Sequence, residues 1–399
     1  MPKRRRKRGL SALVPVILIL LLAIVLIVAT VPRDGGQEPS AETGDPMAPR
    51  TLTIAAAGDV TVTQALLDSG KQADGAYDFT DTFLRAAHLL GDADLTLCNL
   101  EANFCGAPYA AEQYQCPEAL LTALARAGVD FVQTANTASI YNGTSGLQST
   151  ISAIKAAGME PVGTFPSPEA AKESGGYTIV EANGIRVALV AFTKGVGNLN
   201  LPEGMERCVN LLYTDYSTTY QEIDRTGILR VLDRIQEEEP DITLALLHWG
   251  SENDRTVSDT QERIRQLMLE GGVDVILGTH SHLVGPIEEQ TVSERNTLTA
   301  FSLGNLAADT QETATNQGIV LKLEITKEGG VTTVTGYDYT PIYLAGPEET
   351  GKLQVMDTAR ALALCQERSV DALPGDGQES LERSLERVAR YAAPREQDE

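Results

Sequence analysis

The chain has 399 residues and carries 32 Lys+Arg against 55 Asp+Glu, which gives a formal net charge of −23 at pH 7. Without six basic residues near the N-terminus, 26 Lys+Arg stand against 55 Asp+Glu, so the rest of the chain carries −29. A surface this acidic excludes nucleic acid and anionic lipid as partners of the main body, because like charges repel. The length allows one large α/β domain or two small ones, each able to bury a core.

The first 50 residues are predicted to attach the protein to a membrane. A basic cytoplasmic segment, residues 1–9, precedes an uncharged apolar run, residues 10–31, that is long enough to cross a bilayer as a helix. We interpret this run as a transmembrane signal anchor, with a cleaved signal peptide as the alternative. Residues 32–50 are rich in Gly, Pro and acidic residues and predict a flexible linker. The positive-inside rule then predicts a single-pass protein of the cell membrane, with its N-terminus in the cytoplasm and its main domain outside.

Strands and helices are predicted to alternate from residue 51 onwards. The strands cover residues 51–57, 93–97, 129–134 and 161–163, and the helices cover residues 83–90, 120–127 and 147–157. This alternation is typical of βαβ units in a largely parallel sheet. Residues 177–182 and 186–192 are joined across Asn183 and Gly184, a pair typical of a type I′ turn, and predict an antiparallel hairpin. We therefore expect mixed strand directions.

The second half of the chain continues this pattern. Helices are predicted over residues 226–238, 258–270, 358–368 and 379–391, and strands over residues 242–247, 273–277, 298–303, 318–325 and 331–335. The whole pattern predicts an α/β (α+β) fold in which two sheets carry helices on their outer faces. We expect the main domain to cover residues 51–345 and a C-terminal helical extension to cover residues 346–399.

Carboxylates, an amide and imidazoles follow the ends of five predicted strands. These candidate site residues are Asp59, Glu101, Asn136, His248, His280 and His282. The carboxyl ends of strands in open α/β sheets line the ligand crevice, so we expect these side chains to face one another. His280 and His282 would point the same way on an extended chain and could grip one ion. The set suits a divalent metal such as Mn, Zn or Fe, with two ions if a carboxylate bridges them.

Each of these residues also has a simpler interpretation, as a turn residue, a helix cap or a buried histidine with a satisfied hydrogen bond. Three of the four histidines fall between residues 241 and 305, which favours a shared site. The chain has no glycine-rich nucleotide loop, no GxSxG and no HExxH motif, so we expect no cofactor other than metal. Cys105 and Cys116 are close enough in sequence for a disulfide outside the cell, but sequence leaves this pairing open.

Five short motifs occur in a fixed order: GDV at 58–60, NLE at 99–101, HWG at 248–250, GTHSH at 278–282 and SLGN at 302–305. Together they resemble the CapA/PgsA-type capsule (poly-γ-glutamate) synthesis proteins, over about residues 51–343. That family is similar to the calcineurin-like metallophosphatases, so the resemblance implies a four-layer α-β-β-α sandwich of the metallophosphatase type. It also implies a membrane-anchored protein in the synthesis or export of an anionic polymer. Its partners would be membrane-embedded polymer synthase or export components, and the anionic polymer itself.

The resemblance also implies roles for the candidate residues. Asp59, Glu101, His248, His280 and His282 would be metal ligands, with Glu101 as the bridging ligand, Asn136 as a substitute ligand, and His248 and His280 also catalytic. One motif departs from the family, which commonly has Ala-Asn-Asn-His where this chain has Ala135-Asn136-Thr137-Ala138. Thr137 would then replace a ligand, and Ala138 would replace the histidine that protonates the leaving group.

General acid catalysis typically contributes about 10²–10⁴-fold, so its loss would weaken hydrolysis. Two hypotheses follow, a metal-dependent phosphoesterase or hydrolase, and a non-catalytic polymer-binding or scaffold ectodomain of a membrane synthase complex. A structural wall-binding domain that needs no metal is a third.

Overall fold

The computed structural model describes residues 48–308, 310 and 314–395. The predicted cytoplasmic segment, the predicted transmembrane anchor and most of the predicted linker therefore lie outside the described residues. Within the described ranges, no helix is both long and apolar enough to cross a membrane. From Pro49 onwards the chain forms one unit that is built on two β-sheets.

The first sheet combines parallel and antiparallel strands. Its order is β14 (Gln354–Asp357), β13 (Val331–Ala345), β12 (Gln317–Glu328), β1 (Arg50–Thr61), β2 (Leu95–Glu101), β3 (Phe131–Gln133) and β4 (Glu160–Val162), with β11 (Asn305–Ala307) paired to β1 off this path. Strands β1 to β4 run parallel to one another. On the other side of β1, each neighbouring pair is antiparallel: β1 with β12, β12 with β13, and β13 with β14.

The second sheet has a parallel centre and antiparallel edges. Its order is β5 (Thr178–Ala182), β6 (Ile185–Thr193), β7 (Ile242–His248), β8 (Val275–Thr279), β10 (Arg295–Ala300) and β9 (Ile287–Val292). Strands β6, β7, β8 and β10 are parallel, and β5 and β9 are the antiparallel edge strands. Both sheets are therefore mixed, as the sequence predicts.

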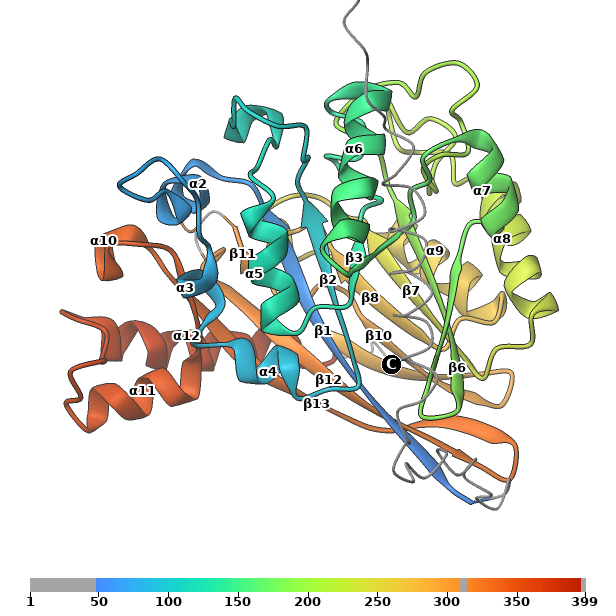
Figure 1. Cartoon of the computed structure of the whole chain (residues 1–399). Helices are drawn as coiled ribbons and strands as arrows, with labels where there is room; N and C mark the ends of the chain where they lie inside the picture. The colour runs from blue at the N-terminus through green and yellow to red at the C-terminus, as the bar shows by residue number, and fades with distance from the viewer. Residues whose placement is uncertain (1–47, 309, 311–313, 396–399) are drawn as a thin grey trace, which may run out of the picture. The chain divides into compact units, whose positions relative to one another are not determined.

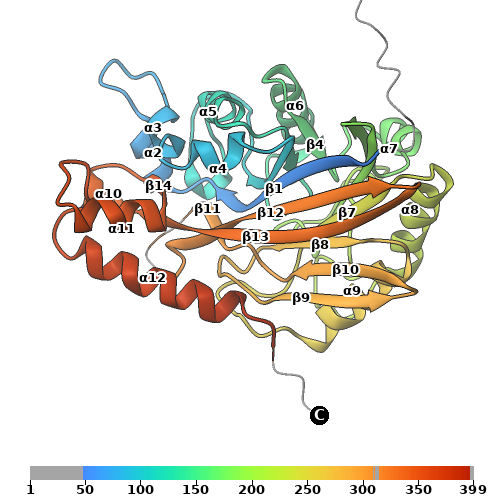
Figure 2. The ribbon, with the colours of Figure 1, turned by 90° about the horizontal axis from the view of Figure 1, so that it is seen from below.

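The two sheets pack face to face around a shared core, and Figure 2 shows β12 and β13 lying over β8, β10 and β9. Ile54 of β1 and Leu189 of β6 point into this core, whereas their neighbours Ala55 and Val190 point outward under helices. Successive side chains of a strand alternate between its faces. A strand covered on both faces therefore has a continuous apolar sequence, as these strands do.

Helices cover the outer face of each sheet (Figure 1). The first sheet is covered by α2 (Gln64–Gly70), α3 (Thr80–Phe83), α4 (Ala87–Gly91), α5 (Ala119–Ala127) and α6 (Gly143–Ala156). The second sheet is covered by α8 (Arg225–Glu237) and α9 (Asp259–Glu270). The short helices η2 (Ala111–Gln113) and α7 (Pro168–Ser174) lie in connections. The layers thus run helix, sheet, sheet, helix.

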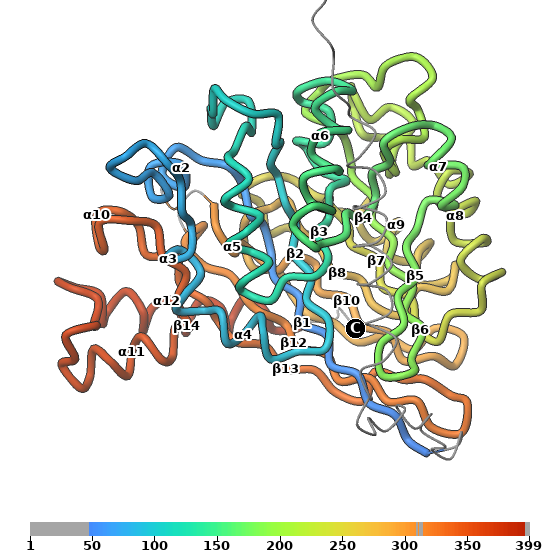
Figure 3. Tube along the Cα trace, viewed as in Figure 1, coloured from blue at the N-terminus to red at the C-terminus, as the bar shows by residue number. Residues whose placement is uncertain are grey.

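The C-terminal segment joins the first sheet. It contains α10 (Pro347–Thr350), β14, α11 (Thr358–Gln366) and α12 (Gly377–Ala392). The backbone N–H of Leu353 donates to Ser69 Oγ at 2.7 Å, so this segment lies beside α2, far from it in sequence (Figure 3). Helix α12 packs on β12 and β13 and places Val388 in the shared core.

The mixed α/β fold expected from the sequence is confirmed, with two kinds of difference in detail. The single helix predicted over residues 83–90 is wrong, because the chain forms α3 and α4 there. Between them, Ala86 N donates to Phe83 O and Leu89 N to Ala86 O, which are three-residue turns that interrupt the α-helical pattern. Strands β9, β11 and β14 were not predicted.

The structure answers two local questions that the sequence raises. Asn183 and Gly184 have φ values of 51° and 70°, the positive values that a type I′ turn requires, so the predicted hairpin turn is confirmed. All five cysteines are free, with Cys105 exposed and Cys116 buried. The disulfide that the sequence left open is therefore not formed.

Candidate functional site

Four strands bring the candidate residues together. Glu101 and His248 are the last residues of β2 and β7, Asp59 lies near the end of β1, and His280 directly follows β8. The pairing of β1 shifts register on either side of Asp59, which marks an irregularity of the strand at that residue. Such irregularities re-aim a side chain. Asp59 and His248 are completely buried, whereas the side chain of His282 is 17% exposed, so the cluster is buried except at His282.

Glu101 and His248 form a buried pair. Glu101 Oε1 lies 2.9 Å from His248 Nε2, and Thr193 Oγ1 lies 3.2 Å from His248 Nδ1. Thr193 donates its only hydroxyl hydrogen to the carbonyl oxygen of Gly195 at 2.8 Å, so it accepts a hydrogen bond from Nδ1. With Nδ1 donating to Thr193, the contact between Nε2 and Glu101 is a hydrogen-bonded ion pair if the ring is protonated, and it brings two acceptors together if the ring is neutral. Two acceptors at this distance require a proton or a metal ion between them.

Asp59 and His282 form a second contact beside the first. His282 Nδ1 lies 3.4 Å from Asp59 Oδ2 and donates to Asn305 Oδ1 at 2.8 Å. Asp59 Oδ2 also accepts from the backbone N–H of His280 at 3.2 Å. The cluster therefore joins the ends of β1 and β8 to Asn305, the first residue of β11.

Asn99 connects the two carboxylates. Its amide nitrogen donates to Asp59 Oδ1 at 2.6 Å and to Glu101 Oε1 at 3.0 Å. The amide thus neutralises part of the repulsion between two buried carboxylates and holds them side by side.

The two histidines of the His-Ser-His sequence are not arranged as predicted. The sequence prediction placed His280 and His282 on an extended chain, but they have φ values of 92° and 60°, in the left-handed region. The two rings therefore have different partners. The ring of His280 faces that of His248 with centroids 4.3 Å apart, whereas His282 faces Asp59. Such backbone strain in non-glycine residues is typical of functional sites.

Burial sets the electrostatics of the cluster. It raises the pKa of Asp59, and the adjacent carboxylate of Glu101 raises it further. Burial also acts to raise the pKa of Glu101, but the contact with His248 outweighs burial and lowers that pKa. Burial also lowers the pKa of His280 well below its usual value. A neutral imidazole is the form that binds metal.

Asn136 supports the cluster from behind. Its amide nitrogen donates to Asn99 Oδ1 at 2.9 Å and to the carbonyl of Leu100 at 2.8 Å, and its Oδ1 accepts from Ala138 N at 3.0 Å. Asn136 therefore reaches the carboxylates through Asn99. Its role as a ligand stays a prediction.

Sequence reasoning missed three residues of the cluster: Asn99, Thr193 and Asn305. Asn99 and Asn305 stand within the NLE and SLGN motifs, so the motifs were the available signal. Thr193 ends β6, and a polar residue after an apolar strand is a weak signal. Each of the three orients a ligand candidate through a hydrogen bond to its side chain.

The metal site itself stays a prediction. Among the residues that the structure describes, no group of three or more His, Cys, Asp or Glu forms a site that could hold a metal ion. The acids and imidazoles instead contact one another directly, Glu101 with His248 and Asp59 with His282.

The fold and this cluster define a mixed α/β protein in which buried carboxylates and imidazoles meet at the ends of strands from two facing sheets. Residues 53–310 match the family model described as bacterial capsule synthesis protein PGA_cap. The chain therefore belongs to the PGA_cap family of bacterial capsule synthesis proteins, and the family expected from the five motifs is confirmed.

Two curated relatives carry related names. The PGA biosynthesis protein CapA of Bacillus subtilis (strain 168) is 33% identical over 103 residues, which are 26% of this chain and 25% of that protein. The capsule biosynthesis protein CapA of Bacillus anthracis is 23% identical over 215 residues, which are 53% of this chain and 48% of that protein. The matched regions thus span half or less of the length of these relatives.

Solved structures with a similar arrangement include calcineurin-like phosphoesterase YfkN from Bacillus subtilis and a hypothetical protein from Thermus thermophilus. The first has a TM-score of 0.42 and 15% identity, covering 85% of this chain and 100% of that chain. The second has a TM-score of 0.43 and 15% identity, covering 73% of this chain and 98% of that chain.

Proposed function

We propose that this chain is a membrane-anchored extracellular protein that acts in the synthesis or export of a capsule polymer of the poly-γ-glutamate type. We also propose that it has a divalent metal site of the metallophosphatase type. The family match over residues 53–310 supports the role in capsule synthesis, and the name of the Bacillus subtilis relative supports the polymer. The uncharged apolar run at residues 10–31 supports the anchor.

The observation that carries the metal site is an unsatisfied imidazole nitrogen within the cluster. His280 Nδ1 is buried and has no hydrogen-bond partner among the described residues, and its ring faces that of His248, which contacts Glu101. A divalent cation would satisfy His280 Nδ1 and offset the charge of the buried carboxylates. The ions we propose are Mn, Zn or Fe, one or two of them, with Asp59, Glu101, His248, His280 and His282 as the residues that would hold them.

The protein's own groups prepare this site for hydrolytic chemistry on a phosphoester or amide. Bound metal would supply Lewis-acid polarisation and a water of lowered pKa. Thr193 orients the ring of His248, Asn305 orients His282, and Asn99 holds the two carboxylates together. Hydrogen bonds of this kind tune metal ligands and raise metal affinity.

Metal analysis of the full-length chain in non-ionic detergent tests this proposal. After incubation with Mn, Zn or Fe and removal of free ion, we expect one or two ions per chain by elemental analysis. His280→Ala is expected to reduce this content, because it removes a ligand. His88→Ala is the matched control, since His88 lies on α4 and contacts Asp357 rather than the cluster. Absence of stoichiometric metal in the wild type, with no effect of His280→Ala, would contradict the proposal.

A second candidate function, a non-catalytic polymer-binding or scaffold ectodomain, is favoured by the segment after β3. The residue at the proton-donor position of the family motif is Ala138, which cannot transfer a proton. Its backbone is held by Asn136 Oδ1 and by the amide nitrogen of Asn103, and its side chain is buried. Thr137, which directly precedes Ala138, is half-buried and has no side-chain group that titrates near pH 7.

The double substitution Thr137→Asn with Ala138→His separates the two functions. If the chain is a degenerate enzyme, we expect turnover of bis(p-nitrophenyl) phosphate to rise by about 10²-fold, the typical gain from a general acid. Unchanged turnover in a double variant that unfolds at the wild-type temperature would show that the missing groups never limited the reaction. The unfolding temperature is needed because a histidine at a buried alanine position must find room.

A further inference from the structure

Three arginines gather around Tyr391 near the end of α12. The guanidinium of Arg255 lies 3.7 Å from the centre of the Tyr391 ring, and that of Arg390 lies 4.8 Å from it. Arg390 also donates to the Tyr391 hydroxyl at 2.8 Å. Arg387 stands three residues before Arg390 on the same face of the helix, and its charge acts on Arg255. We name Arg255, Arg387 and Arg390 the arginine cluster.

The arginine cluster has no acidic partner within the described part of the chain. Two nitrogens of Arg255, Nε and Nη2, are buried there without a hydrogen-bond partner. Buried donors are normally satisfied, and an unsatisfied one is costly, more so when it is charged. In a chain of net charge −23, three neighbouring arginines without a carboxylate form a positive patch that an external anion would neutralise.

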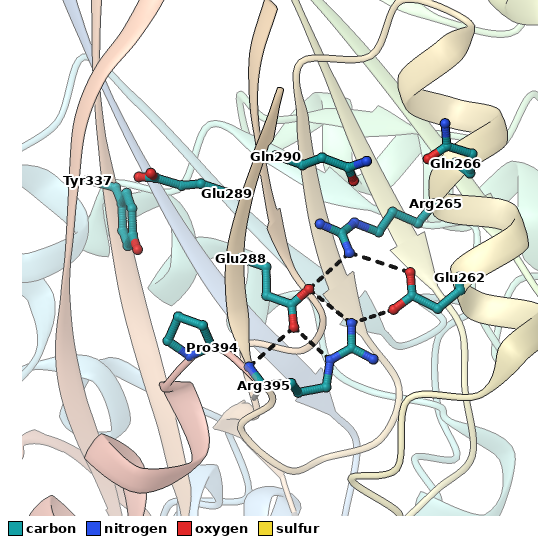
Figure 4. A pocket seen from close by; sticks show the side chains of 9 residues that line it. All are labelled: Glu262, Arg265, Gln266, Glu288, Glu289, Gln290, Tyr337, Pro394 and Arg395. Atoms are coloured by element: carbon teal, nitrogen blue, oxygen red, sulfur yellow. Dashed lines mark hydrogen bonds and ion pairs between the residues drawn. The ribbon is translucent and has the colours of Figure 1, made fainter. Parts of the chain in front are cut away.

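Other arginines of the same region are paired, which makes the contrast informative. Figure 4 shows Arg265 and Arg395 converging on Glu262 and Glu288. Arg265 Nη1 lies 2.9 Å from Glu288 Oε2, and Arg395 Nε lies 2.6 Å from Glu288 Oε1. The pocket drawn there is therefore neutralised by its own carboxylates. On α12 itself, Arg383 is paired with Glu379 at 3.1 Å.

The arginine cluster adjoins the candidate metal centre. Arg255 lies in the connection between β7 and α9, which begins directly after His248. In the same connection, Asn253 N donates to the carbonyl of Ser281 at 3.0 Å, which ties it to the turn between His280 and His282. Arg255 and Ser281 also line one small cavity. Through Arg255, the arginine cluster thus shares a cavity wall with the turn that carries two ligand candidates.

We infer that the arginine cluster is a binding site for carboxylates of an acidic polymer on its way to or from the metal centre. The guanidinium fork matches a carboxylate with two parallel hydrogen bonds. Arg390 is exposed and Arg387 half-buried, so a ligand can reach them from solvent. The choice of a polycarboxylate rests on the proposed function, whereas the need for an anion rests on the unpaired arginines alone.

Binding of a γ-linked oligoglutamate to the full-length chain in non-ionic detergent tests this inference. The measurement is made by fluorescence anisotropy with labelled oligomer in the presence of EDTA, so that it does not depend on metal. We expect the double variant Arg387→Gln with Arg390→Gln to bind about tenfold more weakly or worse, and Arg255→Gln to weaken binding in the same sense. Arg383→Gln is the control for the single variant Arg255→Gln, because it also removes one positive charge, but from a position on α12 that is paired with Glu379. We expect it to bind as the wild type does.

Three results would overturn the inference. The first is that the double variant binds as tightly as the wild type. The second is that Arg383→Gln loses as much binding as Arg255→Gln, which would indicate a general charge effect. Inorganic phosphate or polyphosphate could bind while oligoglutamate does not, which would overturn the polymer class. The result of the metal measurement is independent of the result of this binding measurement. Loss of the metal site with intact oligoglutamate binding would remove the proposed hydrolytic chemistry and leave the arginine cluster standing.

Discussion

Replacing Glu101 by alanine is expected to lower the free energy of unfolding by about 3–5 kcal/mol, the usual cost of removing one partner of a buried ionic pair. The carboxylate is buried, contacts His248 Nε2 at 2.9 Å and accepts from the Asn99 amide at 3.0 Å. The alanine variant leaves both groups buried without that partner. Urea denaturation of the full-length chain in detergent, followed by tryptophan fluorescence, measures the loss, since Trp249 adjoins His248 in the core.

Two comparisons separate the buried pair from a general effect of charge. Glu379→Ala removes an exposed carboxylate that pairs with Arg383 on α12, and we expect a change of only about 0.3–0.5 kcal/mol. The double variant of Glu101→Ala with His248→Ala is expected to lose less than the sum of its two single variants, because the groups are in contact. A loss for Glu101→Ala as small as that for Glu379→Ala would show that the pair does not stabilise the fold.

The strands of the two-sheet core could be predicted because burial on both faces gives them continuous apolar sequences. Strand β7 is buried along its whole length, and its range was predicted to within a residue. Strand β9 was missed because it is an edge strand whose sequence IEEQTV is largely polar. Strand β14 has four residues and exists only because β13 offers it an edge, which no local pattern reveals.

The candidate site was predictable to the level of its titratable residues and no further. Sequence places Glu101 and His248 at strand ends, but their contact joins two different sheets and depends on the packing of those sheets. The different directions of His280 and His282 depend on positive φ values that sequence does not signal at a histidine. Asn99 was overlooked because an asparagine within an apolar strand gives the same sequence pattern in either of two roles. Its side chain can cap a turn, or it can join two carboxylates.

Gly58→Ala is expected to destabilise the protein by about 3 kcal/mol or more, at the upper end of what an oversized core substitution costs. A Cβ atom at position 58 would lie 1.8 Å from the carbonyl oxygen of Gly304 and 2.7 Å from its carbonyl carbon. These Gly304 atoms belong to the backbone, so they cannot rotate away from the new Cβ as the end of a side chain can. The next residue, Asp59, donates its N–H to that same Gly304 oxygen at 2.9 Å, so relief of the clash would break this bond.

The position of Gly58 gives its substitution a second consequence. Strand β1 and the SLGN motif meet backbone to backbone there, which sets Asp59 opposite Asn305. Forcing them apart would separate Asp59 from His282, whose ring is held by Asn305, so we expect the metal content of the proposed site to fall together with stability. Gly336→Ala is the matched control, because position 336 also lies in a strand and its nearest neighbour is a Glu324 oxygen at 3.5 Å, an ordinary contact. Equal losses for the two variants would mean that removal of glycine, rather than the close approach of Gly58 to Gly304, is responsible.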